Sequence, residues 1–204
     1  MVSLDEIMGT ISAQLVAQLR EKTGAGMMDA KKALEEAGGD EVKAVDILRK
    51  KGMKAVEKRQ ERSANQGVVD AYIHANGKVG AMVVLACETD FVARNDEFKT
   101  LAHDIALHVA AMDPKFMLPE DVPAEILERE KGIYREQLKA EGKPEAIWDK
   151  IMEGKLQRFY KEVCLMKQAF VKDDTKTIEG LITGATAKMG EKIELKEYSR
   201  MSIS

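Results

Sequence analysis

The sequence predicts an α+β protein, in which an N-terminal three-helix module precedes a core with a three-stranded antiparallel sheet flanked by helices. Two observations lead to this prediction. The N-terminal part repeats apolar side chains at helical spacing between glycine-containing breaks. After residue 67 two apolar runs follow whose side chains would alternate between the two faces of a strand, and the pair Asn76 and Gly77 separates these runs, as in a β-hairpin.

Length and composition predict a globular protein with one sizeable core or two small ones. The chain has 204 residues, and its 45% hydrophobic and 33% charged residues suffice for a core with a charged surface. The formal net charge of −3 argues against direct binding of nucleic-acid backbones. Neither a signal peptide nor a membrane-spanning run is recognisable, so we expect a cytoplasmic protein without direct contact to nucleic acid or membrane.

Neither a metal centre nor a cofactor is expected. Cys87 and Cys164 are the two cysteines, and their separation matches no zinc motif and no disulfide framework. His103 and His108 are five residues apart, which does not place them on one helix face for metal chelation. No nucleophile with a neighbouring general base is recognisable, so the sequence favours a protein that acts by binding and not as an enzyme with covalent chemistry.

Three short helices make up the predicted N-terminal module, residues 1–52. Ser12 and Asp40 are suitable N-caps for the first and third helices, and glycines follow each helix. The first two helices are expected at about 12–22 and 27–37, and Gly52 is expected to close the third.

The turn between the first two helices has the sequence Thr-Gly-Ala-Gly and is followed by two methionines. A tight helix-helix turn is a better interpretation than a phosphate loop, because no strand precedes it and the Lys-Ser/Thr pair is missing. Met27 and Met28 are adjacent and cannot share one helix face, so at least one of them is expected to point outward. Which of the two does so stays open.

A charged stretch at 53–66 is predicted to be a solvated helical linker into the α+β core and dimerisation domain, residues 67–204. Asn76 and Gly77 predict a two-residue turn with a positive φ at both positions. Pairing outward from this turn sets His74 opposite Val79 and gives the sheet two apolar faces.

Each apolar face of the sheet requires a cover. The helix expected at about 96–112 has an apolar stripe that includes Leu101, Ile105 and Val109, and it can cover one face. No other segment of the chain is an evident cover for the second face. We therefore hypothesise a homodimer in which two sheets pack face to face around a twofold axis.

The C-terminal half contributes two charged surface helices, one more helix and the last strand of the sheet. Three prolines, at 114, 119 and 123, separate the charged pair from the preceding helix. Gly190 is a natural C-cap of the last helix. The expected ranges are 124–140, 144–163, 177–189 and, for the strand, 192–203.

Phe91 stands where the alternating pattern of the second strand stops. A polar segment surrounds this aromatic residue, and a helix pattern resumes only after the N-cap Asn95. Phe91 is therefore expected in a strand-to-helix turn. Two interpretations stay open from the residues alone: the ring is tucked into its own core, or it is held out for a partner.

The segment TDFVARN at 89–95 resembles a motif of the elongation factor Ts family, the guanine-nucleotide exchange factors of bacterial and organellar translation. TGAGMMDAKKAL at 23–34, FVKDD at 170–174 and KMGEKI at 188–193 match the family in the same order, so the resemblance covers essentially the whole chain. It implies an N-terminal module of the ubiquitin-associated type, and nucleotide exchange on elongation factor Tu. Short members of the family dimerise through the sheet, and the resemblance implies the same homodimer for this chain.

The resemblance further implies which residues contact elongation factor Tu. Phe91 would wedge into an apolar pocket of the partner's G domain while Asp90 engages nearby groups, which would disturb Mg²⁺ and loosen the phosphate loop that holds GDP. Met189 stands where the family usually has Ile, and Lys192 where it usually has Asn. The implied partner-binding residues are Arg20, Met27, Met28, Asp90, Phe91, Met189 and Gly190.

An adaptor protein is the alternative function. Its three-helix module would bind ubiquitin-like or nascent-chain ligands, and the core would serve only to dimerise it. Because one fold can host several functions, the predicted architecture alone does not decide between the two hypotheses.

Overall fold

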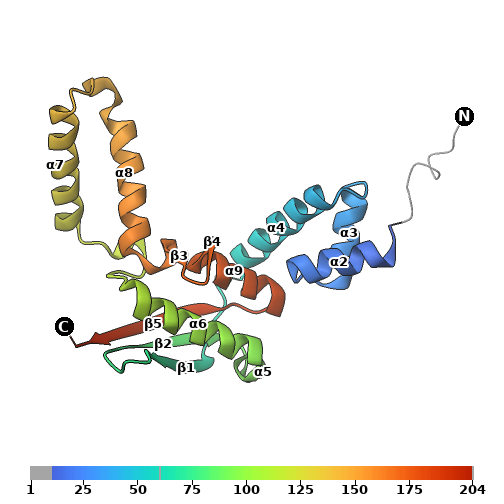
Figure 1. The fold of residues 1–204 in the computed structure, drawn as a ribbon. Helices are drawn as coiled ribbons and strands as arrows, with labels where there is room; N and C mark the ends of the chain where they lie inside the picture. Colours follow the sequence, from blue (N-terminus) through green and yellow to red (C-terminus); the bar gives the residue numbers. More distant parts are fainter. Residues whose placement is uncertain (1–10, 60, 204) are drawn as a thin grey trace, which may run out of the picture. The chain divides into compact units, whose positions relative to one another are not determined.

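The computed structural model describes residues 11–59 and 61–203, and it confirms the predicted α+β class (Figure 1). The chain divides into two compact units. The first unit consists of Met1–Gly67, Ala86–Phe98 and Ile182–Glu194. The second unit consists of Val68–Leu85, Lys99–Leu181 and Leu195–Ser204.

Among the described residues, the first three helices of the first unit are α2 (Ala13–Thr23), α3 (Met27–Glu36) and α4 (Glu41–Glu57). The hydroxyl oxygen of Ser12 accepts the N–H of Leu15 at 3.1 Å and caps α2. Several of the buried residues are alanines, whose small side chains let the helices approach closely. The buried cluster consists of Val16, Leu19, Ala30, Ala33, Leu34 and Ala44.

Helix α4 is longer than the sequence predicted. It continues through Gly52 to Glu57, whereas residues 58–59 and 61–65 are not helical, so the predicted helical linker at 53–66 is wrong over most of its described length. Gly52 does not adopt the positive φ that a C-cap glycine uses. The residues that follow it include Met, Lys, Ala and Glu, which favour helix and carry α4 past the glycine.

The larger sheet has the strand order β1-β2-β5, as in the predicted three-stranded sheet. Its strands are β1 (Gln66–Ile73), β2 (Val79–Cys87) and β5 (Glu194–Ser202). Strands β1 and β2 form a hairpin. Just beyond β5, the N–H of Ile203 donates to the carbonyl of Lys78 at 2.9 Å, beside the start of β2.

The hairpin loop differs from the predicted two-residue turn. The N–H of His74 donates to the carbonyl of Val79 at 2.8 Å, and the N–H of Gly77 donates to the carbonyl of His74 at 2.7 Å. Gly77 has a φ of +67°, whereas Asn76 does not adopt a positive φ. The Asn76 side chain instead accepts the backbone N–H two residues later, at 2.9 Å. The predicted pairing of His74 with Val79 is nevertheless confirmed.

One face of this sheet packs against α6 (Asp96–Met112), as predicted. His103 Nδ1 of α6 lies 3.0 Å from Asp70 Oδ1 of β1, and Arg200 of β5 donates from Nε to the carbonyl of Ala110 at 3.0 Å. These polar contacts link α6 to the strands β1 and β5. On β2, the buried apolar side chains are Ala81, Val83 and Leu85.

The opposite face of the sheet is apolar and exposed. Val69 and Ile73 of β1 are 64% and 72% exposed, and Met82 of β2 is 49% exposed. On β5, Met201 is 73% exposed. Exposed apolar side chains that gather on one sheet face mark an interaction site more often than singly scattered ones do.

The second unit also contains a helical hairpin and a small second sheet (Figure 1). The two charged helices were predicted, and Lys155 of the second donates to Gln137 Oε1 of the first at 2.8 Å. The small sheet was not predicted, because one of its strands has only two residues. These elements are α7 (Ala124–Ala140), α8 (Trp148–Val163), β3 (Ala169–Phe170) and β4 (Asp173–Thr177), with short 3-10 helices at Pro119–Asp121, Glu145–Ile147 and Leu165–Lys167.

A buried polar chain connects α6 to the residues around β3. The fully buried His108 accepts the N–H of Val171 on Nδ1 at 3.2 Å, and its Nε2 lies 2.9 Å from Gln168 Oε1. Nε2 must therefore carry the proton, and the imidazole is neutral. Gln168 in turn donates to the carbonyl of Glu162 at 2.8 Å. His108 thus has a structural role.

Within the described ranges, no helix combines the length and the apolar character that crossing a membrane requires.

Candidate functional site

Phe91 lies on a short helix, α5 (Asp90–Arg94), that directly follows β2. The sequence predicts the first helix of this region only after Asn95, which is wrong because the five residues of α5 are too few to show a helical period. Thr89 is the N-cap of α5, and Asp90 in the first turn pairs with Arg94 in the last turn at 2.9 Å. Asn95 then separates α5 from α6 and accepts the N–H of the second residue after it at 2.8 Å.

The ring of Phe91 points to solvent and is 82% exposed, whereas Ala93 on the same helix is only 8% exposed. The interpretation of Phe91 as a core residue is therefore wrong. The Asp90 side chain beside it is 49% exposed. Together the two residues present a large apolar group and a negative charge to the outside.

Met189 is the last residue of α9 (Ile178–Met189), and Gly190 begins the turn that follows it. Gly190 has a φ of +77°, and its N–H donates to the carbonyl of Thr186 at 3.1 Å, so it caps the helix as predicted. The hydroxyl of Thr186 also accepts the N–H of Ile193 at 3.3 Å. The turn is therefore fixed by bonds to its own helix.

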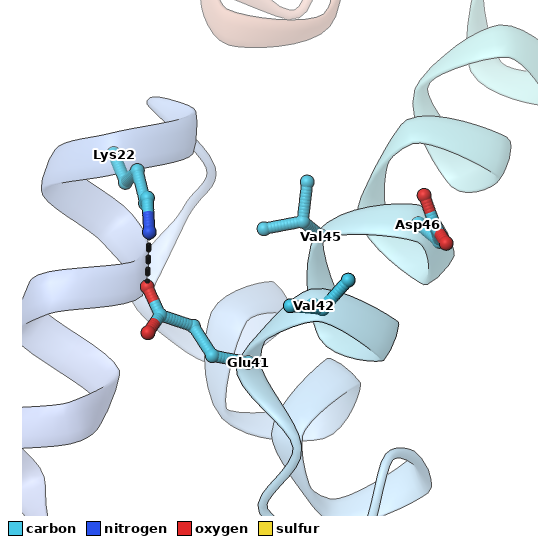
Figure 2. A pocket seen from close by; sticks show the side chains of 5 residues that line it. All are labelled: Lys22, Glu41, Val42, Val45 and Asp46. Carbon is cyan, nitrogen blue, oxygen red and sulfur yellow. Dashed lines mark hydrogen bonds and ion pairs between the residues drawn. The ribbon is translucent and has the colours of Figure 1, made fainter.

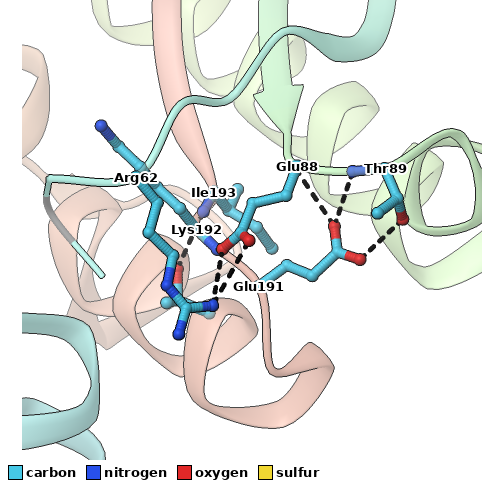
Figure 3. Close-up of polar contacts among 7 residues, drawn as sticks. Arg62, Glu88, Thr89, Glu191, Lys192 and Ile193 are labelled. Atoms are coloured by element: carbon cyan, nitrogen blue, oxygen red, sulfur yellow. Dashed lines mark hydrogen bonds and ion pairs between the residues drawn. The ribbon is translucent and has the colours of Figure 1, made fainter. Parts of the chain in front are cut away.

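Two carboxylates join this turn to the start of α5 (Figure 3). Glu191 Oε2 accepts the backbone N–H groups of Glu88 and Thr89 at 3.1 and 3.0 Å, and Glu191 Oε1 accepts the Thr89 hydroxyl at 2.6 Å. In return, Glu88 Oε1 accepts the backbone N–H of Lys192 at 2.6 Å. We call Glu88 and Glu191 the carboxylate clamp.

Arg62 adds a positive charge to the clamp. Its Nη1 lies 3.4 and 3.3 Å from the two carboxylate oxygens of Glu88 (Figure 3). The hydrogen bond from the Lys192 backbone, and then the charge of Arg62, hold the pKa of the Glu88 carboxyl below its usual value. Glu88 is therefore ionised at neutral pH and accepts both interactions as a charged group.

Cys87 lies next to the clamp at the end of β2 and is fully buried. Its Sγ–H donates to the carbonyl of Thr89 at 3.1 Å. Burial, and then the charge of Glu191, raise the pKa of the thiol. A neutral, buried thiol is a packing group and not a nucleophile.

Neither clamp residue is among the site residues predicted from the sequence. Glu88 and Glu191 stand next to predicted site segments, but the segments that they join are more than a hundred residues apart, as the 103-residue separation of the Glu191–Glu88 bond shows. A residue pattern read locally cannot reveal such a contact. The one signal in the sequence is that Glu191 directly follows the capping glycine Gly190, where a carboxylate side chain can turn away from the helix and contact another segment.

The N-terminal group of predicted site residues lies around the turn between α2 and α3. Met27 and Met28 in the first turn of α3 are 52% and 65% exposed, so both point outward. Arg20 lies in the last turn of α2 and is also exposed. All the residues predicted to bind a partner thus belong to the first unit, and Phe91 is the most exposed apolar side chain among them.

A shallow pocket of about 180 Å³ opens between α2 and α4 (Figure 2). At one side of it, Lys22 Nζ and Glu41 Oε1 form an ion pair at 2.8 Å. Val42, which is 75% exposed, and Val45 provide its apolar surface. The volume is below that of typical small-molecule sites, which begin at about 300 Å³. The pocket can accept a single apolar side chain but not a cofactor.

In the part of the chain that the structure describes, no three His, Cys, Asp or Glu side chains group as metal ligands would. The geometry around Phe91 instead offers an exposed apolar side chain on a short helix that also carries charged residues. Such an arrangement is suited to inserting into a partner protein.

Comparison with known proteins assigns the chain to a family. The family model described as Elongation factor TS matches residues 5–204. Elongation factor Ts of Syntrophus aciditrophicus is 54% identical over 193 residues, which cover 95% of this chain and 96% of that protein. The corresponding protein of Fervidobacterium nodosum is 52% identical, with 95% and 98% covered. That of Desulfitobacterium hafniense is 53% identical, with 96% and 90% covered. The chain therefore belongs to the elongation factor Ts family and is a translation elongation factor.

Proposed function

We propose that this protein binds elongation factor Tu in the cytoplasm and promotes the release of GDP from it, so that GTP can take its place. The observation that carries this proposal is the position of Phe91, which is 82% exposed on a helix held by the carboxylate clamp. In a member of the elongation factor Ts family, an apolar side chain presented in this way supports insertion into the partner.

The mechanism begins with the insertion of the Phe91 ring into an apolar pocket of the partner's nucleotide-binding domain. Because α5 is already formed and clamped, little conformational freedom is lost on binding. Asp90 engages polar groups around the pocket. Displaced partner groups then disturb Mg²⁺, which tolerates little departure from octahedral geometry, and the loop around the phosphates loosens.

The energy for this effect comes from differential affinity and not from covalent chemistry. If the protein binds nucleotide-free elongation factor Tu more tightly than the GDP-bound form, linkage requires that it weaken GDP binding by the same factor. Exchange then proceeds because elongation factor Tu releases GDP more readily while this protein is bound to it.

The other exposed site residues supply additional contacts in this proposal. Met27 and Met28 are long, flexible and exposed, which suits a binding surface that adapts to its partner. Arg20 provides a charge close to them. Met189 and Gly190 provide a contact beside Phe91, since the carboxylate clamp connects their turn to α5.

We also propose that the protein forms a homodimer through the exposed face of the sheet. The support is the apolar surface on β1, β2 and β5, which a second copy would cover by packing sheet against sheet. A twofold axis would place the same surface on both sides of the contact. The apolar side chains concerned are Val69, Ile73, Met82 and Met201.

The proposal is tested by stopped-flow measurement of the release of a fluorescent GDP analogue from elongation factor Tu, with and without this protein. We expect the release rate to rise with the concentration of the protein and to approach a plateau. A release rate that does not change in the presence of folded protein would overturn the proposal and favour the adaptor alternative.

A further inference from the structure

We infer that Glu191 is a positioning residue for nucleotide exchange: its carboxylate fixes the start of α5, and thereby the direction of Phe91, without itself contacting the partner. This inference rests on the function proposed above and names the residue on which the geometry of that site depends.

Helix α5 is too short to hold its own shape. It has five residues, and helices of this length are unstable in water without tertiary support. Its N-cap is weak as well, because Thr89 Oγ1 lies 3.5 Å from the N–H of Val92 that it caps. Another group must therefore fix the backbone that precedes Phe91.

Glu191 is the group that does so. Its two carboxylate oxygens accept three hydrogen bonds from Glu88 and Thr89, at 3.1, 3.0 and 2.6 Å. Hydrogen bonds to a carboxylate are shorter and stronger than those between neutral groups. They hold the two residues directly before α5, and so they set the direction in which the helix leaves β2.

Both oxygens of Glu191 face donors within the chain, which separates its role from that of Asp90 and Phe91. Glu191 is partly buried, whereas Phe91 is 82% exposed. A carboxylate engaged in this way acts on the partner through the backbone that it holds and not by direct contact.

Loss of Glu191 should release α5 and leave the turn after α9 in place. That turn keeps two bonds of its own, from Gly190 N–H to the Thr186 carbonyl at 3.1 Å and from Ile193 N–H to the Thr186 hydroxyl at 3.3 Å. The effect of the substitution should therefore pass through Phe91 and leave Gly190 in position.

The test compares Glu191→Ala, Glu191→Gln and the control Glu153→Ala, a substitution of an exposed glutamate on α8. GDP release from elongation factor Tu is measured at saturating concentrations of each variant. We expect Glu191→Ala to lower the release rate roughly tenfold, as for the loss of hydrogen bonds to a charged group. Glu191→Gln should recover most of the rate, because its amide oxygen can accept both backbone N–H groups. Glu153→Ala should match the wild type.

A double-mutant cycle with Phe91→Ala separates positioning from general stability. If Glu191 acts through Phe91, the double variant should release GDP at the same rate as Phe91→Ala alone. Amide hydrogen exchange at Glu88 and Thr89 should also become faster in Glu191→Ala. Additive effects in the cycle, or an unchanged rate in Glu191→Ala, would overturn the inference.

Two further outcomes have defined meanings. If Glu191→Ala does not unfold cooperatively, Thr89→Val replaces it, since it removes the hydroxyl that donates to Glu191 at 2.6 Å. An unchanged release rate in Thr89→Val would then overturn the inference. If wild-type protein does not accelerate GDP release, the proposed function fails, whereas wild-type acceleration with a fully active Glu191→Ala variant overturns only the role of Glu191.

Discussion

Phe91 and Phe98 belong to the same compact unit and have opposite environments: the ring of Phe91 is 82% exposed, and that of Phe98 is fully buried. The two side chains are chemically identical, so the difference between them comes from the backbone that carries them. The clamped helix α5 directs Phe91 outward, whereas the first turn of α6 directs Phe98 into the core. This contrast provides a matched pair for separating binding from stability.

Replacing each phenylalanine by alanine should have very different effects on stability. Phe98→Ala leaves a cavity and should lower the free energy of unfolding by about 3–5 kcal/mol. Phe91→Ala removes an exposed ring and should change it by less than about 0.5 kcal/mol. Urea unfolding of both variants measures these differences. A loss of several kcal/mol in Phe91→Ala would mean that the ring packs against the protein in solution.

The buried His108 should make stability fall as the pH is lowered from 7.5 to 5.5. Burial depresses the pKa of this imidazole below its usual value of 6.5. In this range the unfolded chain therefore binds the proton before the folded chain does, and the folded state loses stability as the pH falls. Between these two pH values the free energy of unfolding should fall by at most about 1.4 kcal/mol, which is the value expected if His108 binds its proton only in the unfolded chain.

Urea unfolding of the wild type and of two histidine variants at both pH values shows whether His108 causes this pH dependence of stability. His108→Asn should lose the pH dependence, whereas His103→Gln, which changes an exposed histidine, should keep it. Stability that is independent of pH in the wild type would argue against the neutral His108 with its bonds to Gln168 and Val171.

Both thiols should be unreactive in the folded protein. Cys87 and Cys164 are buried, and burial, followed by the charges of Asp121 and Glu120, raises the pKa of Cys164 to about 11. Alkylation by iodoacetamide at pH 8 should therefore be slow until the protein unfolds. A Ser63→Cys variant, with a thiol at an exposed position, provides the fast-reacting control. Rapid labelling of the native wild type would show that one of the buried sites opens.

A charge on the exposed face of the sheet should disrupt the proposed homodimer. Ile73→Glu places a carboxylate on a face that the second copy would cover, and burying an unpaired charge is costly. Ile133→Glu on α7 is the matched control, since Ile133 is also partly exposed but lies away from the sheet. Sedimentation equilibrium should show a dimer for the wild type and the control, and a monomer for Ile73→Glu. A monomeric wild type at micromolar concentration would contradict the proposal.

The sequence predicted the long elements well because their signals are local. The apolar stripe of α6, the glycine cap at Gly190 and the pairing of His74 with Val79 depend on residues close together in the chain. Local signals also explain two errors. Gly52 was taken as a helix end, but the helix formers after it carry α4 onward. Asn76 uses its side chain to stabilise the hairpin loop and has no need of a positive φ.

The candidate site was predictable in its residues but not in its geometry. The motif identified Phe91, yet the sequence could not decide between a buried and an exposed ring, because the decision depends on how the backbone leaves β2. That direction depends on Glu191, which meets Thr89 only in the folded chain. Helix α5 itself is too short to produce a recognisable hydrophobic period.

The most direct test of the account compares wild-type protein with Phe91→Ala in stopped-flow release of a fluorescent GDP analogue from elongation factor Tu. We predict that the variant keeps its cooperative unfolding and lowers the plateau rate of GDP release by roughly tenfold or more, as for the loss of one buried aromatic anchor. A folded Phe91→Ala variant that releases GDP as fast as the wild type would contradict the central claim that the exposed ring of Phe91 carries out the exchange.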